Sequence, residues 1–265
     1  MSDLERATRT AYDTASAAWA SGPERVYTRL AEAVLEHCPV PLDGAALLDV
    51  GAATGVLGRE ASARGARCVD ADVAVDMLRR GRPPGHHVVA ADGRALPFRG
   101  GAFDVVAGNC SLSHVGDPDR MVAEAGRVTR HGGAVVFSAF PATSTSHRAW
   151  SVVESVLADH GYERPEWYRH LKAETEPRVG SADALARLAR TASLAAVDVV
   201  DERVDTGVAD PGALVDWRLG MAQHAAFLAR TPPARRADIR ATAIARLGDD
   251  PDPLSVDLLV LVGRP

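Results

Sequence analysis

The 265-residue sequence predicts an α/β fold built around one largely parallel sheet. Through the first half of the chain, short apolar segments typical of buried strands alternate with segments of helical periodicity. One of these strands runs directly into a small-residue turn and a helix, in Leu47-Leu48-Asp49-Val50-Gly51-Ala52-Ala53-Thr54-Gly55. Two further apolar strands occur late in the chain. Strands and helices in alternation form parallel sheets with right-handed crossovers.

The elements follow in a clear order. Two helices, at 8–19 and 23–37, precede the sheet. The alternating part then predicts strands at 46–50, 67–71, 87–91, 103–108 and 134–140, with helices at 55–64, 74–81 and 119–129. Later the pattern loosens to helices at 146–160 and 181–192, a strand at 195–202, a mostly helical segment and a final strand at 255–262.

Composition limits the function classes. The net charge of −5 and the lack of a basic run argue against a nucleic-acid partner. No apolar run approaches the roughly 20 residues of a membrane span, and the N-terminus lacks a secretory signal. Cys38, Cys68 and Cys110 are too scattered for a disulfide frame or a zinc site. We therefore expect a cytoplasmic protein without a metal, whose oligomeric state the sequence leaves open.

The turn after the first strand carries the functional signal. Small side chains at Gly51 and Gly55 let a ligand approach the backbone, and the following helix adds unpaired N–H donors. The carboxylate of Asp49, just before the turn, would repel a pyrophosphate but suits a ligand with an ammonium or sulfonium group. This segment resembles the first motif of the S-adenosylmethionine-dependent methyltransferases of the Rossmann-like class, of the type that acts on small molecules.

The resemblance extends over about residues 46–140. Asp72 ends the second strand, and the residues after it, through Met77-Leu78, are similar to the family pattern in which the acidic residue binds the ribose hydroxyls. Asp72 could instead simply cap the helix that follows. Asp92-Gly93 precedes Leu96-Pro97-Phe98, similar to the family's adenine-facing signature. Glu124-x-x-Arg127 and Gly132-Gly133 also resemble family motifs.

The resemblance implies S-adenosylmethionine as cofactor and S-adenosylhomocysteine as its product. The implied cofactor-binding residues are Tyr12, Asp49, Gly51, Ala53, Thr54, Gly55, Asp72, Val73, Met77, Asp92, Gly93, Asn109 and Ser111. Two positions depart from the family: Ala53 replaces its middle glycine, and Asn109-Cys110-Ser111-Leu112 is not the motif of enzymes that methylate amide or exocyclic amino nitrogens. The second departure argues against nucleic-acid bases and protein glutamine as acceptors.

His114, just past the fourth strand, is the candidate catalytic residue, because a neutral imidazole there could take a proton from an acceptor hydroxyl. It could equally orient a loop or cap the next helix. The candidate substrate residues are Trp150, Trp167, Tyr168, Trp217 and His224. Trp217, Met221, His224 and Leu228 are spaced to share one helix face, which is also the spacing of plain core packing. The aromatic residues favour a partly apolar small-molecule acceptor, polyketide-like or quinone-like, of the kind found in secondary metabolism.

For the whole chain, the resemblance implies a Rossmann-like, seven-stranded, mostly parallel sheet with an antiparallel last strand. It divides a single domain, 1–265, into an N-terminal helical cap (1–40), a cofactor-binding core (45–140), substrate-facing helices and a lid with one core strand (141–253), and the final strand (254–265). Two other functions stay open. This fold can bind the cofactor for other chemistry or for regulation. Ala53-x-Gly55-x-x-Gly58 is also a degenerate dinucleotide fingerprint, as in an NAD-dependent oxidoreductase.

Overall fold

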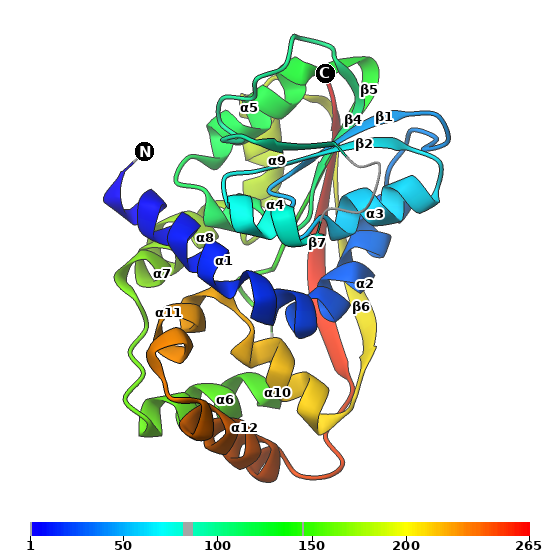
Figure 1. The fold of residues 1–265 in the computed structure, drawn as a ribbon. Coiled ribbons are helices and arrows are strands. Elements are labelled where there is room, and N and C mark those ends of the chain that lie inside the picture. The colour runs from blue at the N-terminus through cyan, green and yellow to red at the C-terminus, as the bar shows by residue number, and fades with distance from the viewer. Residues whose placement is uncertain (1, 82–86, 145) are drawn as a thin grey trace.

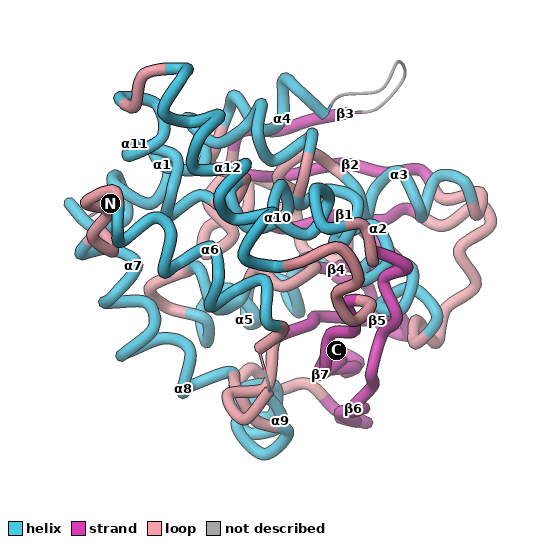
Figure 2. The backbone as a smooth tube through the Cα atoms, turned by 90° about the horizontal axis from the view of Figure 1, so that it is seen from below, coloured by secondary structure: helices cyan, strands magenta, loops and turns pink. Residues whose placement is uncertain are grey.

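The fold is that of a computed structural model, which describes residues 2–81, 87–144 and 146–265. Its centre is a seven-stranded sheet in the order β3-β2-β1-β4-β5-β7-β6. In the view from below, the strands follow one another in this order across the picture (Figure 2). The strands are β1 (Ala46–Val50), β2 (Arg67–Asp72), β3 (His87–Ala90), β4 (Phe103–Gly108), β5 (Thr129–Ala139), β6 (Ala195–Val208) and β7 (Leu254–Arg264).

Strand direction confirms the predicted sheet. Pairs from β3 to β5 are parallel, whereas β7 lies antiparallel between β5 and β6. The chain builds β1, β2 and β3 outward in one direction and then returns to place β4 on the other side of β1. The carboxyl ends of β1 and β4 therefore form a topological switch point, where open α/β sheets bind their ligands.

Helices cover both faces of the sheet (Figure 1). Neighbouring strand residues point to opposite faces, so Leu47 and Val105 pack with α1 to α3, whereas Leu48 and Val106 pack with α5 and α9. The helices of the first half are α1 (Asp3–Ser21), α2 (Pro23–Glu36), α3 (Val56–Ala63), α4 (Val75–Gly81), η1 (Leu112–His114) and α5 (Pro118–Val128). Those of the second half are α6 (Arg148–Asp159), α7 (Glu166–His170), η2 (Leu171–Thr175), α8 (Glu176–Val179), α9 (Ala182–Thr191), α10 (Pro211–Leu219), α11 (Ala222–Arg230) and α12 (Pro233–Leu247).

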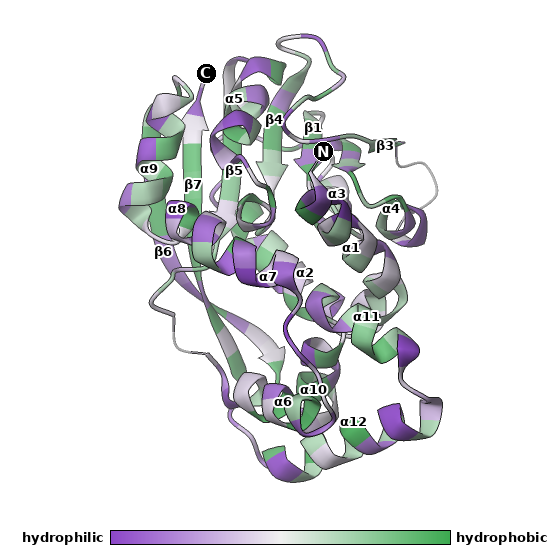
Figure 3. Cartoon of the chain, turned by 90° about the vertical axis from the view of Figure 1, so that its left-hand side faces the viewer, coloured by the Kyte–Doolittle hydropathy of each residue, from purple (hydrophilic) through white to green (hydrophobic). Residues whose placement is uncertain are grey.

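The second half builds a helical layer beyond one end of the sheet. Helices α10, α11 and α12 are inserted between β6 and β7; α10 and α12 pack with α6 at the lower end of the molecule, and α11 lies above them against α1 (Figure 1). Coloured by hydropathy, α12 shows a mixed surface of polar and apolar residues, whereas β4 and β7 are largely apolar (Figure 3). Helix α1 contacts both this layer, through α11, and the sheet's own helix α4.

Several predicted boundaries differ from the structure. Helix α1 starts at Asp3 rather than at residue 8, because Ser2 and Glu5 form a reciprocal capping box. Strand β5 starts at Thr129 and β6 continues to Val208, since their polar ends are held by pairing with neighbouring strands. The short helices α7 and α8 and the π-helical turn η2 between them were not predicted. Within the described ranges, no helix combines the length and apolar character needed to cross a bilayer.

Candidate functional site

Two adjoining cavities lie beyond the carboxyl ends of the strands. The first, which we call the strand-tip cavity, has an empty volume of about 1150 Å³ and is bounded by segments that follow β1, β2, β3 and β4, with α1 as a further wall. The second, the helical cavity, has about 1490 Å³ and is bounded by α6, α7, η2 and α10. Tyr27 and His114 line both cavities. The site is therefore arranged as two compartments with a common boundary.

The turn after β1 forms the floor of the strand-tip cavity. Gly51 and Gly55 both have positive φ, of 76° and 71°, which glycine adopts without strain. A Cβ atom on Gly51 would lie 2.5 Å from the Cβ of Ser111, so glycine is also needed for the close approach of the two strand-end loops. Ala53 has a φ of 50°, in the left-handed region that alanine disfavours. The departure from the family pattern thus falls where the backbone is strained.

Asp49 lies at the bottom of this cavity and is 1% exposed. Neither of its carboxylate oxygens has a hydrogen-bond partner of ordinary geometry among the residues that the structure describes. Burial, followed by the neighbouring charge of Asp70, raises the pKa of Asp49 well above its ordinary value. Among the described residues, the backbone N–H of Gly58 is the one hydrogen-bonding group that lowers this pKa, so the buried carboxylate is poorly compensated and a bound cation would reduce the cost of its burial.

Asp72, at the end of β2, holds the turn from below. One carboxylate oxygen accepts a hydrogen bond from the Ala53 backbone N–H at 2.7 Å, and the other accepts one from Ala74 N–H at 2.8 Å. The residue therefore caps the start of the α4 segment, and it also lines the strand-tip cavity. Beside it, the apolar side chain of Val73 is 40% exposed.

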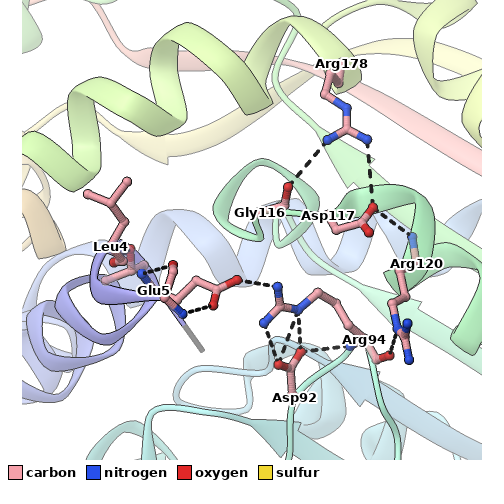
Figure 4. Close-up of polar contacts among 10 residues, drawn as sticks. Leu4, Glu5, Asp92, Arg94, Gly116, Asp117, Arg120 and Arg178 are labelled. Carbon is pink, nitrogen blue, oxygen red and sulfur yellow. Dashed lines mark hydrogen bonds and ion pairs between the residues drawn. The ribbon is translucent and has the colours of Figure 1, made fainter.

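Asp92 follows β3 and is engaged by Arg94 (Figure 4). The guanidinium donates to both carboxylate oxygens, with Nη2 2.7 Å from Oδ2, and it also contacts Glu5 of α1. These hydrogen bonds from Arg94 lower the pKa of Asp92. The backbone oxygen of Arg94 in turn accepts from Arg120 of α5 at 2.9 Å. Arg94 thus ties the N-terminal helix to the rim of the strand-tip cavity.

His114 stands at the boundary of the two cavities. Its Nδ1 lies 3.2 Å from the hydroxyl of Tyr12, a residue of α1. Burial, assisted by the positive charge of Lys172, lowers the pKa of His114 to about 4. Burial also raises the pKa of Tyr12 well above its ordinary value. At neutral pH the pair is therefore an uncharged imidazole and an uncharged phenol.

The structure brings most of the predicted cofactor residues to the strand-tip cavity. Those that line it are Tyr12, Asp49, Gly51, Ala53, Asp72, Val73, Asp92, Gly93, Asn109 and Ser111. Thr54, Gly55 and Met77 lie outside its lining: Thr54 is buried, Gly55 packs against the Asp70 carboxylate, and Met77 is fully buried in the core. These three residues can therefore affect ligand binding only indirectly: Thr54 and Gly55 through the shape of the turn, and Met77 through the packing of α4.

The predicted substrate residues are divided. Trp150, Tyr168 and Trp217 line the helical cavity, but Trp167 and His224 line neither of the two cavities. His224 is fully buried, with its ring nitrogens 2.8 Å from the Arg218 carbonyl oxygen and 2.8 Å from Glu154 Oε1. His224, in α11, therefore links this helix to α10 and α6 by hydrogen bonds.

The expected single helix through Trp217, Met221, His224 and Leu228 is wrong. Helix α10 ends at Leu219, and α11 begins at Ala222 after an extended Met221 with a ψ of 143°. The break lies beside a close contact, since a Cβ on Gly220 would lie 2.4 Å from Pro23 Cδ and 2.7 Å from the Ala18 carbonyl oxygen. Glycine at this position therefore permits the tight approach of α10 to the α1–α2 junction.

Several residues of the site were missed by sequence reasoning. Glu5, Thr8 and Arg9 of α1 line the strand-tip cavity, and Lys172 and Arg218 line the helical cavity. The capping-box spacing of Ser2 and Glu5 was a usable signal for the longer helix. A second usable signal was Lys172 itself, because it is the single lysine of the sequence. Nothing in the sequence indicated Arg218 among so many arginines. In the described part of the chain, no group of three or more His, Cys, Asp or Glu residues is placed to hold a metal ion.

Comparison with known proteins agrees with this architecture. Residues 48–137 match a family model described as a methyltransferase domain, which confirms the resemblance found in the sequence. A demethylmenaquinone methyltransferase of Mycobacterium sp. (strain KMS) is 35% identical over 142 residues, covering 54% of this chain and 59% of the relative. A second, from Corynebacterium urealyticum, is 33% identical over 129 residues, covering 49% of this chain and 54% of that protein. The chain thus spans less than two thirds of the length of these relatives.

Among solved structures, the chain resembles a putative methyltransferase from an antibiotic biosynthesis pathway of Anabaena variabilis. The TM-score is 0.62 at 15% sequence identity, over 90% of this chain and 98% of that one. At this identity the likeness establishes the fold, and it confirms the Rossmann-like arrangement that the sequence predicted.

Proposed function

We propose that the protein transfers a methyl group from S-adenosylmethionine to a small-molecule acceptor, a proposal supported by the match of residues 48–137 to a methyltransferase-domain model. The observation that carries this proposal is the pair of cavities that meet at His114. One contains the carboxylates of Asp49 and Asp72, and the other is walled by aromatic residues. Such a pair accommodates a cationic donor on one side and a partly apolar acceptor on the other.

The residues of the strand-tip cavity fit this cofactor. The buried Asp49 carboxylate would hold the ammonium group of the methionine half, next to the backbone of Gly51 and Ala53. Asp72 would accept hydrogen bonds from the ribose hydroxyls, and the exposed apolar face of Val73 would contact the base. Further roles are assigned to Asp92 and Gly93, which would face the adenine, and to Tyr12, Asn109 and Ser111, which would border the methionine end and the methyl group.

In this proposal the chain mainly orients and shields the reactants. The bound cofactor supplies an electrophilic methyl group on a sulfonium. The aromatic walls of the helical cavity hold the acceptor in line with that group and exclude water. Orientation of this kind can lower a barrier by roughly 7–11 kcal/mol. The cap (1–40) closes one side of the cofactor core (45–140), and segment 141–253 surrounds the acceptor. A quinone-like acceptor is supported by the name of the mycobacterial relative.

The proposal is tested by binding and by product. Calorimetry is expected to show that the purified chain binds S-adenosylhomocysteine and S-adenosylmethionine but not NAD. Incubation with S-adenosylmethionine and a panel of aromatic hydroxy compounds and quinols should yield an acceptor heavier by one methylene, together with S-adenosylhomocysteine. Cofactor binding without any methylated product would instead support a regulatory role or other chemistry on this fold. Binding of NAD alone would overturn the proposal.

We further propose that His114 takes the proton from an acceptor hydroxyl as the methyl group arrives. With a pKa of about 4 it is unprotonated at neutral pH but is a weak base. His114→Asn should therefore lower kcat by no more than about 100-fold, the low end of general-base catalysis. The rate of the wild type should be level above pH 5 and decline as the pH falls through 4, because protonation removes the base. The variant should lose this acid limb.

Tyr12→Phe provides the companion measurement, since it removes the hydroxyl 3.2 Å from the imidazole and leaves the ring in place. A smaller fall in kcat, with the acid limb retained, is the expected result. An unchanged kcat and an unchanged pH profile in His114→Asn would end the assignment of His114 as a base.

A further inference from the structure

We propose that the methyl acceptor is a flat, unsaturated acid whose carboxylate is bound by Arg218 in the wall of the helical cavity. The inference rests on the proposed function and narrows its substrate class. Its basis is a buried cation that lines the cavity and has no hydrogen-bond partner for two of its nitrogens.

The Arg218 side chain is only 2% exposed, although it lines the helical cavity. Its Nε and Nη2 atoms are buried, and neither has a hydrogen-bond partner within the described ranges of the chain. Burying a charge is costly unless it is paired and hydrogen-bonded. Other buried polar groups of this layer are satisfied, such as His224, which lies 2.8 Å from two oxygens. Arg218 therefore has capacity left for an anion.

The other charges near Arg218 are already engaged. Glu154 is the nearest carboxylate, with Oε1 4.0 Å from Arg218 Nη2, too far for a hydrogen bond. That same oxygen accepts from His224 at 2.8 Å, and Oε2 accepts from Arg164 at 3.1 Å. Lys172, a second cation of the cavity wall, is paired with Glu176. Arg218 is thus the lining cation that its neighbours satisfy least.

The walls around this cation are aromatic. The guanidinium carbon lies 3.9 Å from the ring centroid of Trp150 and 5.1 Å from that of Trp217. Tyr168 and Phe140 add further aromatic surface to the lining. These rings hold the guanidinium in place through cation–π contact but supply no acceptor for its N–H groups. They also offer flat faces against which a conjugated ring system can stack.

A π-helical turn places the second cation. Lys172 lies in η2, and its Nζ is 5.4 Å from the Trp150 centroid and 5.6 Å from the Tyr168 centroid. π-helical turns are rare and occur often at functional sites. Lys172 therefore lies beside the same tryptophan that Arg218 covers, but its charge is paired with Glu176, so the preference for an anionic acceptor rests on Arg218.

The test compares matched acids and amides. The chain is first saturated with S-adenosylhomocysteine, and calorimetry then measures the affinity for salicylate against salicylamide and for 1-hydroxy-2-naphthoate against 1-hydroxy-2-naphthamide. We expect at least one acid to bind about 30-fold more tightly than its amide, the size of effect that charged hydrogen bonds produce. Equal affinity within each pair, or no binding by any acid, would overturn the inference.

Variants separate recognition from structure. Arg218→Gln should bring the acid-to-amide ratio close to one, while Arg218→Lys should keep part of it. Arg169→Gln removes an exposed arginine from the neighbouring α7 and should leave the ratio unchanged. If Arg218→Gln weakens acid and amide alike, Arg218 has a structural role only and the inference is wrong. Should Arg218→Gln not fold, the acid-to-amide affinity ratios of the wild type and of Arg218→Lys decide the matter.

Failure of this inference is distinguishable from failure of the proposed function. A chain that does not bind S-adenosylhomocysteine contradicts the function itself. A chain that binds S-adenosylhomocysteine and methylates neutral acceptors as well as acids contradicts only the carboxylate site.

Discussion

Replacing Asp72 with alanine is expected to weaken the binding of S-adenosylhomocysteine by about 10²–10⁴-fold. The carboxylate would accept hydrogen bonds from two ribose hydroxyls, and each hydrogen bond to a charged group contributes about 1.5–3 kcal/mol. Asp72 also accepts from the Ala53 and Ala74 backbone, so part of the loss comes from loosening of the turn. Isothermal titration calorimetry with wild type and variant measures the total.

The ribose contribution is isolated by a second ligand. The wild type should bind 2′-deoxy-S-adenosylhomocysteine more weakly than S-adenosylhomocysteine. Asp72→Ala should bind the two ligands with nearly equal affinity, and the four affinities together form a double-mutant cycle. Asp76→Asn is the matched control, because this exposed carboxylate of α4 lies outside the lining of the strand-tip cavity. An equal penalty for the deoxy ligand in wild type and Asp72→Ala would remove the ribose role.

Asp49→Asn is expected to have opposite effects on binding and on stability. The variant loses a buried partner for the ammonium group, which should weaken cofactor binding by about 10²–10³-fold. Without ligand, however, it should be more stable than the wild type at neutral pH. The reason is that burial and Asp70 raise the pKa of Asp49, so the folded state holds its proton more tightly than the unfolded state.

The sign of the pH dependence follows from that shift. A carboxyl group with a raised folded-state pKa loses stability as the pH rises above its unfolded value of about 4. Asp49→Asn should therefore raise the stability of the ligand-free protein at pH 7.5, and this increase should disappear toward pH 4. The Tm should rise by about 2–4 °C for each kcal/mol of unfolding free energy gained. Wild-type cofactor affinity should increase with pH and release a proton. An Asn variant that is less stable than wild type at pH 7.5 would contradict this account of Asp49.

Local sequence predicted the central sheet well. Strands β1 and β4 begin and end at the predicted residues, because each is a short, mostly apolar and largely buried segment. The end of β6 beyond residue 202 was missed, since Arg203 and Asp205 resemble a surface loop and become strand only by pairing with Asp257 and Ser255 of β7. Such pairing joins distant parts of the chain and leaves no local pattern.

The residues of the site likewise fall into those that local sequence predicts and those that depend on contacts between distant segments. The carboxylates of Asp49 and Asp72 were predictable because both stand at the tips of parallel strands, and parallel strands end at one edge of a sheet. The pairing of Arg94 with Asp92 and Glu5 was not, since it depends on where α1 crosses the rim of the strand-tip cavity. His224 was misplaced because the expected single helix is two helices, separated by the extended Met221.

The sheet, the strand-tip carboxylates and the family resemblance could all be predicted from the chain, because they follow from short-range periodicity and motif spacing. The folded chain was needed to place His114 between two cavities and to bury Arg218 against Trp150 without a hydrogen-bond partner for Nε or Nη2 among the described residues. The physical reason is that burial and charge pairing are properties of packed neighbours. For Arg218 those neighbours come from α6 and α10, which lie far apart in the chain.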